Sequence, residues 1–246
     1  IMINKDNSNI NTESINTEEL FFKESDLTSD SINTIVNDSL RNADDGELFI
    51  EYCESESFVF DDRKLKNASF DVSKGFGLRA IANEATGYAH SSNIDKASLK
   101  RASDTVSFIT NNNKGNYNSN FNRTNKKLYS DSNPVNSVDF KNKVKTLEDI
   151  DKYARSINPM VKQVSSSLSG EWQVVRIYRP DGLLVEDIRP LVRLNISVVL
   201  EKNGRLETGS RGVGGRVDYQ KFLEEDYWKK QVDGALRQAE INLQSI

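Results

Sequence analysis

The 246-residue chain has very few of the side chains that bind transition metals, since its single cysteine is Cys53 and its single histidine is His90. A catalytic zinc site normally uses three protein ligands and leaves a fourth position open for water. One cysteine and one histidine complete this set of three ligands only together with carboxylates. No motif in the sequence arranges carboxylates for that purpose. We therefore expect this chain to bind no metal and to carry no catalytic residues of its own.

Neither of these two residues lies in a setting typical of catalysis. Cys53 is flanked by Glu51 and Glu54, and nearby carboxylates raise the pKa of a thiol, so we do not expect a nucleophile there. His90 has no second imidazole nearby, and we interpret it as a surface or capping histidine. A lone cysteine cannot form an internal disulfide, which is typical of proteins of the reducing cytosol.

The sequence also lacks long apolar runs and strong clusters of charge. No stretch approaches the ~20 apolar residues of a membrane helix, and the polar residues 2–6 lack the apolar core of a signal peptide. The net charge of -4 is spread along the chain, which argues against nucleic-acid binding. We interpret short lysine groups such as Lys141, Lys143 and Lys145 as solvated faces. A cytoplasmic protein without nucleic-acid or membrane partners is expected.

What the sequence does have is alternation of apolar and polar residues, the period of strands with one buried and one solvated face. Between residues 47 and 90 this pattern predicts three or four successive β segments, with a charged turn at residues 61–64. Gly75 and Gly77 permit a close approach of another part of the chain. The same pattern predicts further strands and turns at residues 162–169, 172–178, 179–182, 193–201 and 202–205.

Apolar residues spaced by three and four predict helices between these β regions. We expect them at residues 32–43, 94–109, 146–157 and 219–243. Asp30 or Ser31 is the expected cap of the first helix and Asn93 that of the second, while the sequence from Thr146 resembles a capping box that opens the third. Pro159 stops this third helix.

The order of helix, strands, glycine-rich turn and helix occurs twice, which suggests an internal duplication. The expected fold class is α+β, with mainly antiparallel sheets flanked by helices. We expect a mostly disordered tail at residues 1–22, a first α/β unit at 23–110, an Asn-rich connection at 111–145 and a second α/β unit at 146–246.

Several short sequence motifs, taken in their order along the chain, indicate a protein family. They are Ala43-Asp44-Asp45-Gly46-Glu47, Asp62-Arg63, Gly75-Phe76-Gly77-Leu78-Arg79-Ala80, Thr86-Gly87-Tyr88-Ala89, Ser167-Leu168-Ser169-Gly170, Asp187-Ile188-Arg189-Pro190-Leu191-Val192-Arg193-Leu194 and Gly212-Val213-Gly214-Gly215-Arg216. This series resembles the amino-terminal half of the TldD proteins, in the TldD/PmbA family of bacterial zinc metallopeptidases. The resemblance covers residues 32–243 and implies a short strand at residues 127–129.

The resemblance implies that zinc and the His-Glu-x-x-x-His motif belong to a carboxy-terminal catalytic domain that this chain lacks. It implies that this half walls a channel for short or unfolded peptides and pairs with a TldD/PmbA-type subunit as a homo- or heterodimer. An alternative is a non-catalytic peptide- or partner-binding module from a truncated gene, and a third hypothesis is an independent hydrolase. The reading frame downstream of Ile246 would distinguish the first two.

The arginines inside these motifs, Arg79, Arg189 and Arg193, are candidates for holding a peptide, because a guanidinium binds carboxylates and carbonyls with a fixed fork of donors. Internal pairing with nearby aspartates (Asp45, Asp62 or Asp187) explains the same residues and is the favoured interpretation.

Gly212, Gly214 and Gly215 form the second candidate group. Their surroundings lack the Gly-Lys-Ser/Thr ending of a phosphate-binding loop, so a flexible strand-to-helix crossing is favoured. The family resemblance places this crossing as a loop that faces the peptide channel.

Overall fold

The computed structural model describes residues 15–112, 115 and 128–245. Its elements are α1 (Thr17–Phe22), α2 (Ser29–Leu40), β1 (Asp45–Asp61), β2 (Lys64–Ala82), β3 (Ala85–Ser91), α3 (Lys96–Asn112), α4 (Phe140–Ile157), β4 (Val161–Tyr178), the 3-10 turn η1 (Pro180–Gly182), β5 (Leu184–Lys202), β6 (Arg205–Gly215), α5 (Gln220–Leu223) and α6 (Glu225–Gln244). Residues 1–14, most of the expected tail, lie outside this description.

All six strands form one antiparallel sheet in the order β3-β2-β1-β4-β5-β6, which confirms the expected α+β fold. The strands are longer than the sequence pattern predicts. β1 has 17 residues and β2 has 19, where we expected several short segments. The pattern breaks at the polar residues 51–57, but pairing with β2 and β4 satisfies the backbone there and the strand continues.

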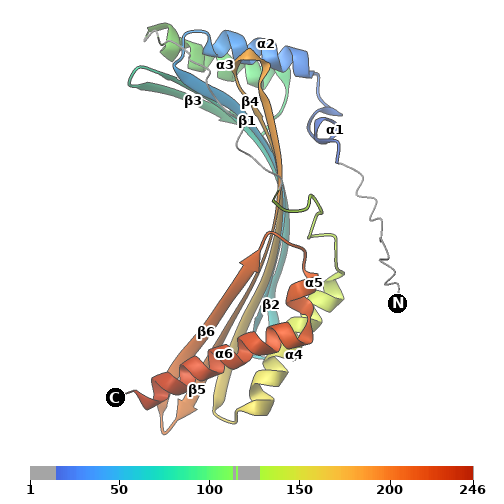
Figure 1. Ribbon diagram of the computed structural model, residues 1–246, viewed down its shortest axis with the longest axis vertical. Helices are drawn as coiled ribbons and strands as arrows, with labels where there is room; N and C mark the ends of the chain where they lie inside the picture. Colours follow the sequence, from blue (N-terminus) through green and yellow to red (C-terminus); the bar gives the residue numbers. More distant parts are fainter. Residues whose placement is uncertain (1–14, 113–114, 116–127, 246) are drawn as a thin grey trace, which may run out of the picture.

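The helices at the two ends of the sheet cover the same face. They are α2 and α3 at one end and α4 and α6 at the other. Successive side chains of a strand point to opposite faces, so residues of equal parity share a face. In β1 the buried residues near its start, Leu48 and Ile50, and those near its end, Phe58 and Phe60, are all even-numbered. The sheet curves into a crescent with the helices on its outer side and an inner face that none of the described helices covers (Figure 1).

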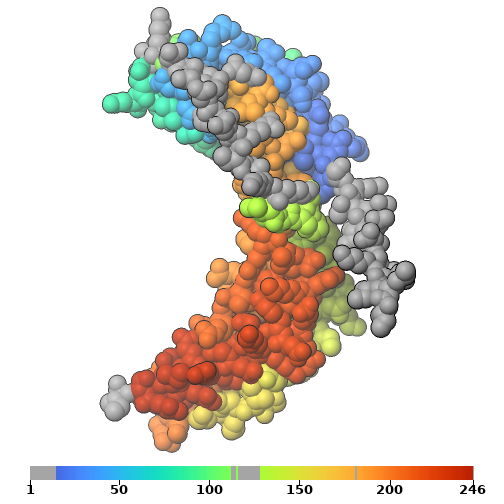
Figure 2. Space-filling model, in the orientation of Figure 1, coloured from blue at the N-terminus to red at the C-terminus, as the bar shows by residue number. Residues whose placement is uncertain are grey.

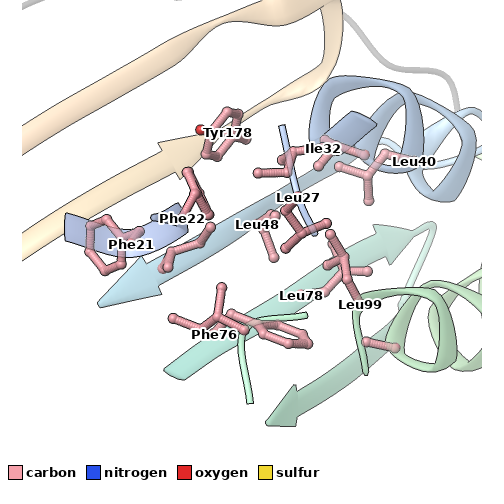
Figure 3. Close-up of a cluster of buried hydrophobic side chains, with 14 of the residues drawn as sticks. Phe21, Phe22, Leu27, Ile32, Leu40, Leu48, Phe76, Leu78, Leu99 and Tyr178 are labelled. Carbon is pink, nitrogen blue, oxygen red and sulfur yellow. The ribbon is translucent and has the colours of Figure 1, made fainter. Parts of the chain in front are cut away.

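The buried residues form two hydrophobic cores, one at each end of the crescent. The first core packs α1, α2 and α3 against the sheet through residues that include Phe22, Ile32, Leu40, Leu48, Leu78, Leu99 and Tyr178 (Figure 3). The second core packs α4, α5 and α6 through residues that include Phe60, Leu147, Ile150, Leu168, Ile196, Phe222 and Trp228. Phe21 and Phe22 of α1 are both buried in the first core, so this end of the expected tail packs on the sheet.

The two ends repeat one arrangement. In the first unit, α2 precedes the strands β1, β2 and β3, and α3 follows and packs on β3 and β2. In the second unit, α4 precedes β4, β5 and β6, and α6 follows and packs on β6 and β5. The repeated order of helix, strands and helix is confirmed, but the glycine-rich segments expected as turns are parts of strands β2 and β6. Descent of both units from one duplicated ancestor stays a hypothesis. We use "first unit" for residues 29–112 and "second unit" for residues 140–244.

Three helix boundaries differ from the sequence prediction because other side chains cap them. Thr28, rather than Asp30 or Ser31, accepts from the backbone N–H of Ser31 and caps α2. Asp95, rather than Asn93, accepts from the backbone N–H of Ser98 at 2.7 Å and caps α3. The third predicted helix starts earlier than expected and is capped by Asp139.

Helix α4 begins at Phe140 instead of Thr146, inside the expected Asn-rich connection, and Asp139 caps it. The first turn of α4 is polar in sequence, but Lys143 is 1% exposed and belongs to the interior. The interpretation of Lys143 as a solvated side chain was therefore wrong. Helix α4 ends at Ile157 ahead of Pro159, as predicted.

The predicted terminal helix is interrupted at Glu224, whose extended backbone separates α5 from α6. Residues 128 and 129 are not in a strand, so that part of the strand implied at 127–129 was wrong, while residue 127 lies outside the described part.

The predicted turns are confirmed. Asp62 and Arg63 link β1 to β2, and Asn203 and Gly204 link β5 to β6, with positive φ at all four residues as two-residue hairpins require. Gly182, also at positive φ, lies in the turn between β4 and β5. Among the helices of the described residues, none has the length and apolarity that a membrane crossing needs.

Candidate functional site

The uncovered inner face of the sheet, which we call the bare face, brings most of the predicted site residues together. Arg79 pairs in register with Glu47, Arg189 with Gln173, and Arg193 with Ser169. Opposite residues of an antiparallel pair share a face, and these are all odd-numbered residues of β1, β2, β4 and β5. The three candidate arginines, one on β2 and two on β5, therefore point toward the hollow side of the crescent. Figure 2 shows the outline of this hollow side.

Arg79 is held by carboxylates, as the structural interpretation predicts. Its Nε donates to Glu47 Oε1 at 2.8 Å, and its Nη2 lies 3.5 Å from Asp45 Oδ2. Arg179, at the end of β4, also pairs with Asp45 and with Glu47. The hydrogen bond from Arg79 to Glu47 and the surrounding negative charge raise the pKa of this guanidinium. Two arginines thus share two carboxylates at one end of the bare face.

Arg189 belongs to a polar chain that crosses three strands. Its Nε donates to Asp187 Oδ2 at 2.6 Å, and its Nη1 donates to Gln173 Oε1 at 3.4 Å. The Gln173 amide in turn donates to Glu51 Oε2 at 2.6 Å. Pairing with Asp187 is confirmed for Arg189, but Asp62 pairs with Arg155 of α4 and with no candidate arginine.

Arg193 is the candidate whose charge has no carboxylate partner among the described residues. It is exposed, and its Nε donates to Asn195 Oδ1 at 3.0 Å. Gly212 and Gly214 lie opposite Asn195 and Arg193 on β6. A Cβ at Gly212 would lie 3.3 Å from Arg193 Nη2, so glycine leaves the space that this guanidinium occupies.

The glycine string does not form a loop. Residues 205–215 are the outermost strand β6, so the predicted strand-to-helix crossing at these glycines was wrong. Gly215 lies opposite Val192, whose side chain belongs to the covered face, so Gly215 is separated from the other candidates. A further glycine of β6, Gly209, lies on the covered face, where α6 packs closely against the strand. A Cβ at Gly209 would lie 2.0 Å from the carbonyl oxygen of Ala235.

A pocket of about 490 Å³ opens on the bare face of the first unit. Its lining includes Phe49, Arg79, Tyr88 and His90. His90 lies on β3 opposite Gly77, and its ring stacks on Tyr88 with the centroids 5.7 Å apart. His90 is exposed, which agrees with its interpretation as a surface residue. Sequence reasoning missed this pocket, although the shared parity of Phe49, Gly77 and Arg79 was a usable signal.

Cys53 lies near the middle of the bare face, between Ser73 of β2 and Gln173 of β4. Burial, followed by the charges of Glu171 and Glu51, raises the pKa of its thiol to about 11. The thiol is therefore protonated at neutral pH, which agrees with the expectation that Cys53 is not a nucleophile.

The residues of the bare face do not fit a zinc ion. Within residues 15–112, 115 and 128–245, no three histidine, cysteine, aspartate or glutamate side chains come close enough to hold a metal. Carboxylates of this face are neutralised by ion pairs, that of Glu47 with Arg79 and that of Asp187 with Arg189. The face instead offers guanidinium groups, amides, hydroxyls and glycine backbone, which are groups that bind peptide carbonyls and carboxylates.

Two family models match the chain. The model described as PmbA/TldA metallopeptidase domain 1 matches residues 46–109, and the model described as PmbA/TldA metallopeptidase central domain matches residues 133–243. The Metalloprotease TldD homolog of Haemophilus influenzae is 38% identical over 221 residues, which are 85% of this chain and 45% of that protein. The Metalloprotease TldD homolog of Buchnera aphidicola from Acyrthosiphon pisum is 33% identical over 215 residues, 83% of this chain and 44% of that protein.

The fold has a solved counterpart. TldE from Thermococcus kodakarensis superposes with a TM-score of 0.63 at 14% identity, covering 85% of this chain and 47% of that one. The curved antiparallel sheet with helices on one face therefore corresponds to the first and central domains of a metallopeptidase architecture. The chain belongs to the PmbA/TldD metallopeptidase family and spans about half the length of the curated relatives it matches.

Proposed function

We propose that this chain is the amino-terminal half of a TldD-type zinc metallopeptidase and that its bare face lines a channel for short or unfolded peptides. One observation carries the proposal: a chain that matches the family's first and central domain models presents its motif residues Arg79, Arg189, Arg193, Gly212 and Gly214 on one uncovered, inward-curving face. In this proposal the residues bind and orient peptides, and the catalytic step belongs to the other half of the enzyme.

The chemistry of the bare face supports binding of extended peptides. Arg193 has donors free of any carboxylate in the described part of the chain, so it can bind a substrate carboxylate or carbonyl. Gly212 leaves room for the Arg193 guanidinium, and Gly214 leaves the sheet surface opposite Arg193 without a side chain, so a peptide backbone can approach closely there. Arg79 and Arg189 are held by their ion pairs and so present fixed donors at low entropic cost.

A zinc ion and a partner subunit complete the proposed enzyme. We propose that the family's zinc is bound by the carboxy-terminal half, since the side chains described here do not fit it. We propose that the partner is a TldD/PmbA-type subunit in a cytoplasmic homo- or heterodimer. The first unit and the second unit are proposed as the two divisions of this half, with the second beginning at α4 instead of at residue 146 as expected from the sequence.

The test is complementation. This chain would be mixed with the separately expressed carboxy-terminal half of the Haemophilus influenzae TldD homolog, together with Zn²⁺ and an unstructured fluorogenic peptide. We expect cleavage only when both halves are present, and its loss on adding a chelator. Chelator-sensitive cleavage by this chain alone would contradict the proposal. Binding of the peptide without cleavage in the mixture would favour the non-catalytic binding module.

A second measurement tests the bare face itself. Arg193→Ala should raise KM for the peptide several-fold with little change in kcat, because it removes a contact made equally in the ground and transition states. Arg237→Ala is the matched control, since Arg237 is an equally exposed arginine of α6 on the helix-bearing side. Equal effects of the two substitutions would assign the loss to net charge and remove the proposed role of the bare face.

A further inference from the structure

One long strand edge of the sheet is open. β3 pairs with β2 only from Phe76 to Ala82, so residues 64–74 of β2 have β1 on one side and no strand on the other within the described part of the chain. All of these residues are exposed. Half of the backbone N–H and C=O groups of such an edge point outward, and they form a ready template for another extended chain.

The equivalent edge of the second unit is closed. β6 pairs with β5 only from Val192 to Lys202, so residues 184–191 have β4 on one side alone. Pro190 interrupts this edge because it has no N–H, and Arg216 Nη1 donates to the Pro190 carbonyl at 3.3 Å. Tyr129 bonds to Asp187 beside it. Residues 64–74 of β2 include no proline, and no other described residue covers this edge in the same way, although the two units share one element order.

The open edge carries positive charge and exposed apolar side chains. Residues 63–74 include the cations Arg63, Lys64, Lys66 and Lys74 against the single carboxylate of Asp71. The three lysines make no ion pair with any carboxylate of the described residues. Phe70 and Val72 are 61% and 46% exposed, and their even numbering places them on the helix-bearing face with Lys74. Phe70 lies opposite Glu56 in the register of β1.

This charge pattern opposes pairing with a second copy of the same strand. A two-fold axis that joins two β2 edges keeps each face on its own side, so residues of equal parity come to lie opposite one another. Centring the pair on Phe70 places Lys66 opposite Lys74. Like charges directly opposite are destabilising. A chain that carries carboxylates turns the same lysines into attractive contacts.

We propose that the β2 edge, residues 64–74, binds an extended acidic peptide segment as an added strand. The segment matches the edge when carboxylates lie opposite Lys66 and Lys74 and apolar side chains lie between them, near Phe70 and Val72. Main-chain hydrogen bonds supply affinity without regard to sequence, and the lysines select for acidic segments. The inference rests on the proposed role in peptide handling and names its substrate class as unfolded peptides rich in Asp and Glu.

The probe is a labelled nine-residue peptide with Glu at positions 1 and 9, Val at 3, 5 and 7 and Ser elsewhere, and its counterpart has Lys in place of Glu. Fluorescence anisotropy on the full 246-residue chain should show tighter binding of the acidic probe. The triple variant Lys64→Glu, Lys66→Glu, Lys74→Glu should weaken the acidic probe by about tenfold at low salt and favour the basic one. The control variant Lys100→Glu, Lys141→Glu, Lys230→Glu changes the net charge equally on exposed helical residues and should leave the affinity unchanged.

A second readout is independent of any variant. A strand bound at one edge uses the N–H groups of alternate residues only. N-methylation of the acidic probe at odd positions and at even positions should therefore have opposite outcomes, one set abolishing binding and the other tolerated. Hydrogen exchange should show added protection at residues 64–74 when the probe is bound. Equal effects of both methylated sets, or protection confined to another strand, would overturn the inference.

The remaining outcomes separate this inference from the proposed function. Equal loss of affinity in the two triple variants would overturn the edge site and leave complementation as the test of the enzyme role. Failure of complementation, together with acidic-probe binding at β2, would overturn the enzyme role and retain the edge site. A dimer of this chain that the acidic probe does not dissociate would assign the edge to a second copy and overturn the inference.

Discussion

The two cores of the crescent each enclose one cation, and they hold it differently. In the second core Lys143 lies over the rings of Phe58 and Tyr219 and pairs with Glu56, whose side chain is 9% exposed. In the first core Arg176 lies near the rings of Phe22 and Tyr178, but its partner Glu186 is 42% exposed.

The difference matters because a buried carboxylate cannot recover its hydration when its partner is removed. Lys143 also donates to the carbonyl of Val135 at 2.8 Å. It therefore ties the segment before α4 to β1, the strand of the first unit whose last residues, Phe58 and Phe60, belong to the second core. In the second core both members of the ion pair are buried, and the pair lies where the two units meet. In the first core one member of the ion pair is exposed to solvent.

Replacing the sealed cation should have the largest effect on stability. Lys143→Met keeps the side-chain volume but leaves Glu56 buried without a partner, so we expect the free energy of unfolding to fall by about 3–5 kcal/mol. Arg176→Met should cost clearly less, because Glu186 can be hydrated. Urea denaturation followed by far-UV circular dichroism measures both. The double variant Lys143→Met, Glu56→Met should recover most of the loss, and equal losses for Lys143→Met and Arg176→Met would break the comparison between the cores.

Glycines beneath the last helix of each unit sharpen the comparison. A Cβ at Gly209 would lie 2.0 Å from the Ala235 carbonyl oxygen of α6, whereas a Cβ at Gly87 would lie 3.3 Å from the side chain of Ile109 in α3. Backbone cannot give way as a side chain can, so Gly209→Ala should cost about 3 kcal/mol and Gly87→Ala about 1 kcal/mol. The difference between their urea midpoints measures this. Equal midpoints would mean that α6 moves off β6 as easily as α3 adjusts.

The two strand edges give the third contrast. Ile188, near the closed edge of β5, is 8% exposed and belongs to the first core, while Phe70 at the open edge of β2 is 61% exposed. Ile188→Ala should cost about 2 kcal/mol, at the low end for a buried isoleucine because the site lies near the rim. Phe70→Ala should change the free energy of unfolding by no more than about 0.5 kcal/mol. A large loss for Phe70→Ala would show that this edge is already covered in the isolated chain.

Many of the strands, turns and helices could be predicted from residue types, because the sequence patterns that specify them involve residues close together along the chain. Period-two alternation identified the strands, and turn residues such as Asn203 and Gly204 marked the hairpins. Alternation cannot show that a polar stretch such as residues 51–57 remains in one strand, since that depends on pairing with β2 and β4 on both sides. The burial of Lys143 also lies beyond local pattern, because Glu56 comes from a strand far away in sequence.

The candidate site was predicted in part for the same reason. Family motifs and parity bring Arg79, Arg189 and Arg193 to one face, and their partners Asp45 and Asp187 were among those considered. The sequence alone does not show which face the helices leave uncovered, because both faces of β1 carry apolar residues near its ends. For Gly215, a single residue of register decides the side, and the glycine string gives no alternation from which to read it.

The N-caps of the first helix in each unit should show the smallest difference. Thr28 caps α2 in a reciprocal capping box with Ser31, and Asp139 caps α4 through the backbone N–H of Asn142 at 2.7 Å. Thr28→Ala and Asp139→Ala should each cost about 1 kcal/mol. Asp139→Ala should cost a few tenths more at low salt, because its negative charge also faces the positive end of the helix dipole. Urea titrations with and without about 0.5 M NaCl isolate this increment: salt should reduce the loss for Asp139→Ala and leave that for Thr28→Ala unchanged, whereas equal salt dependence would make the two caps equivalent.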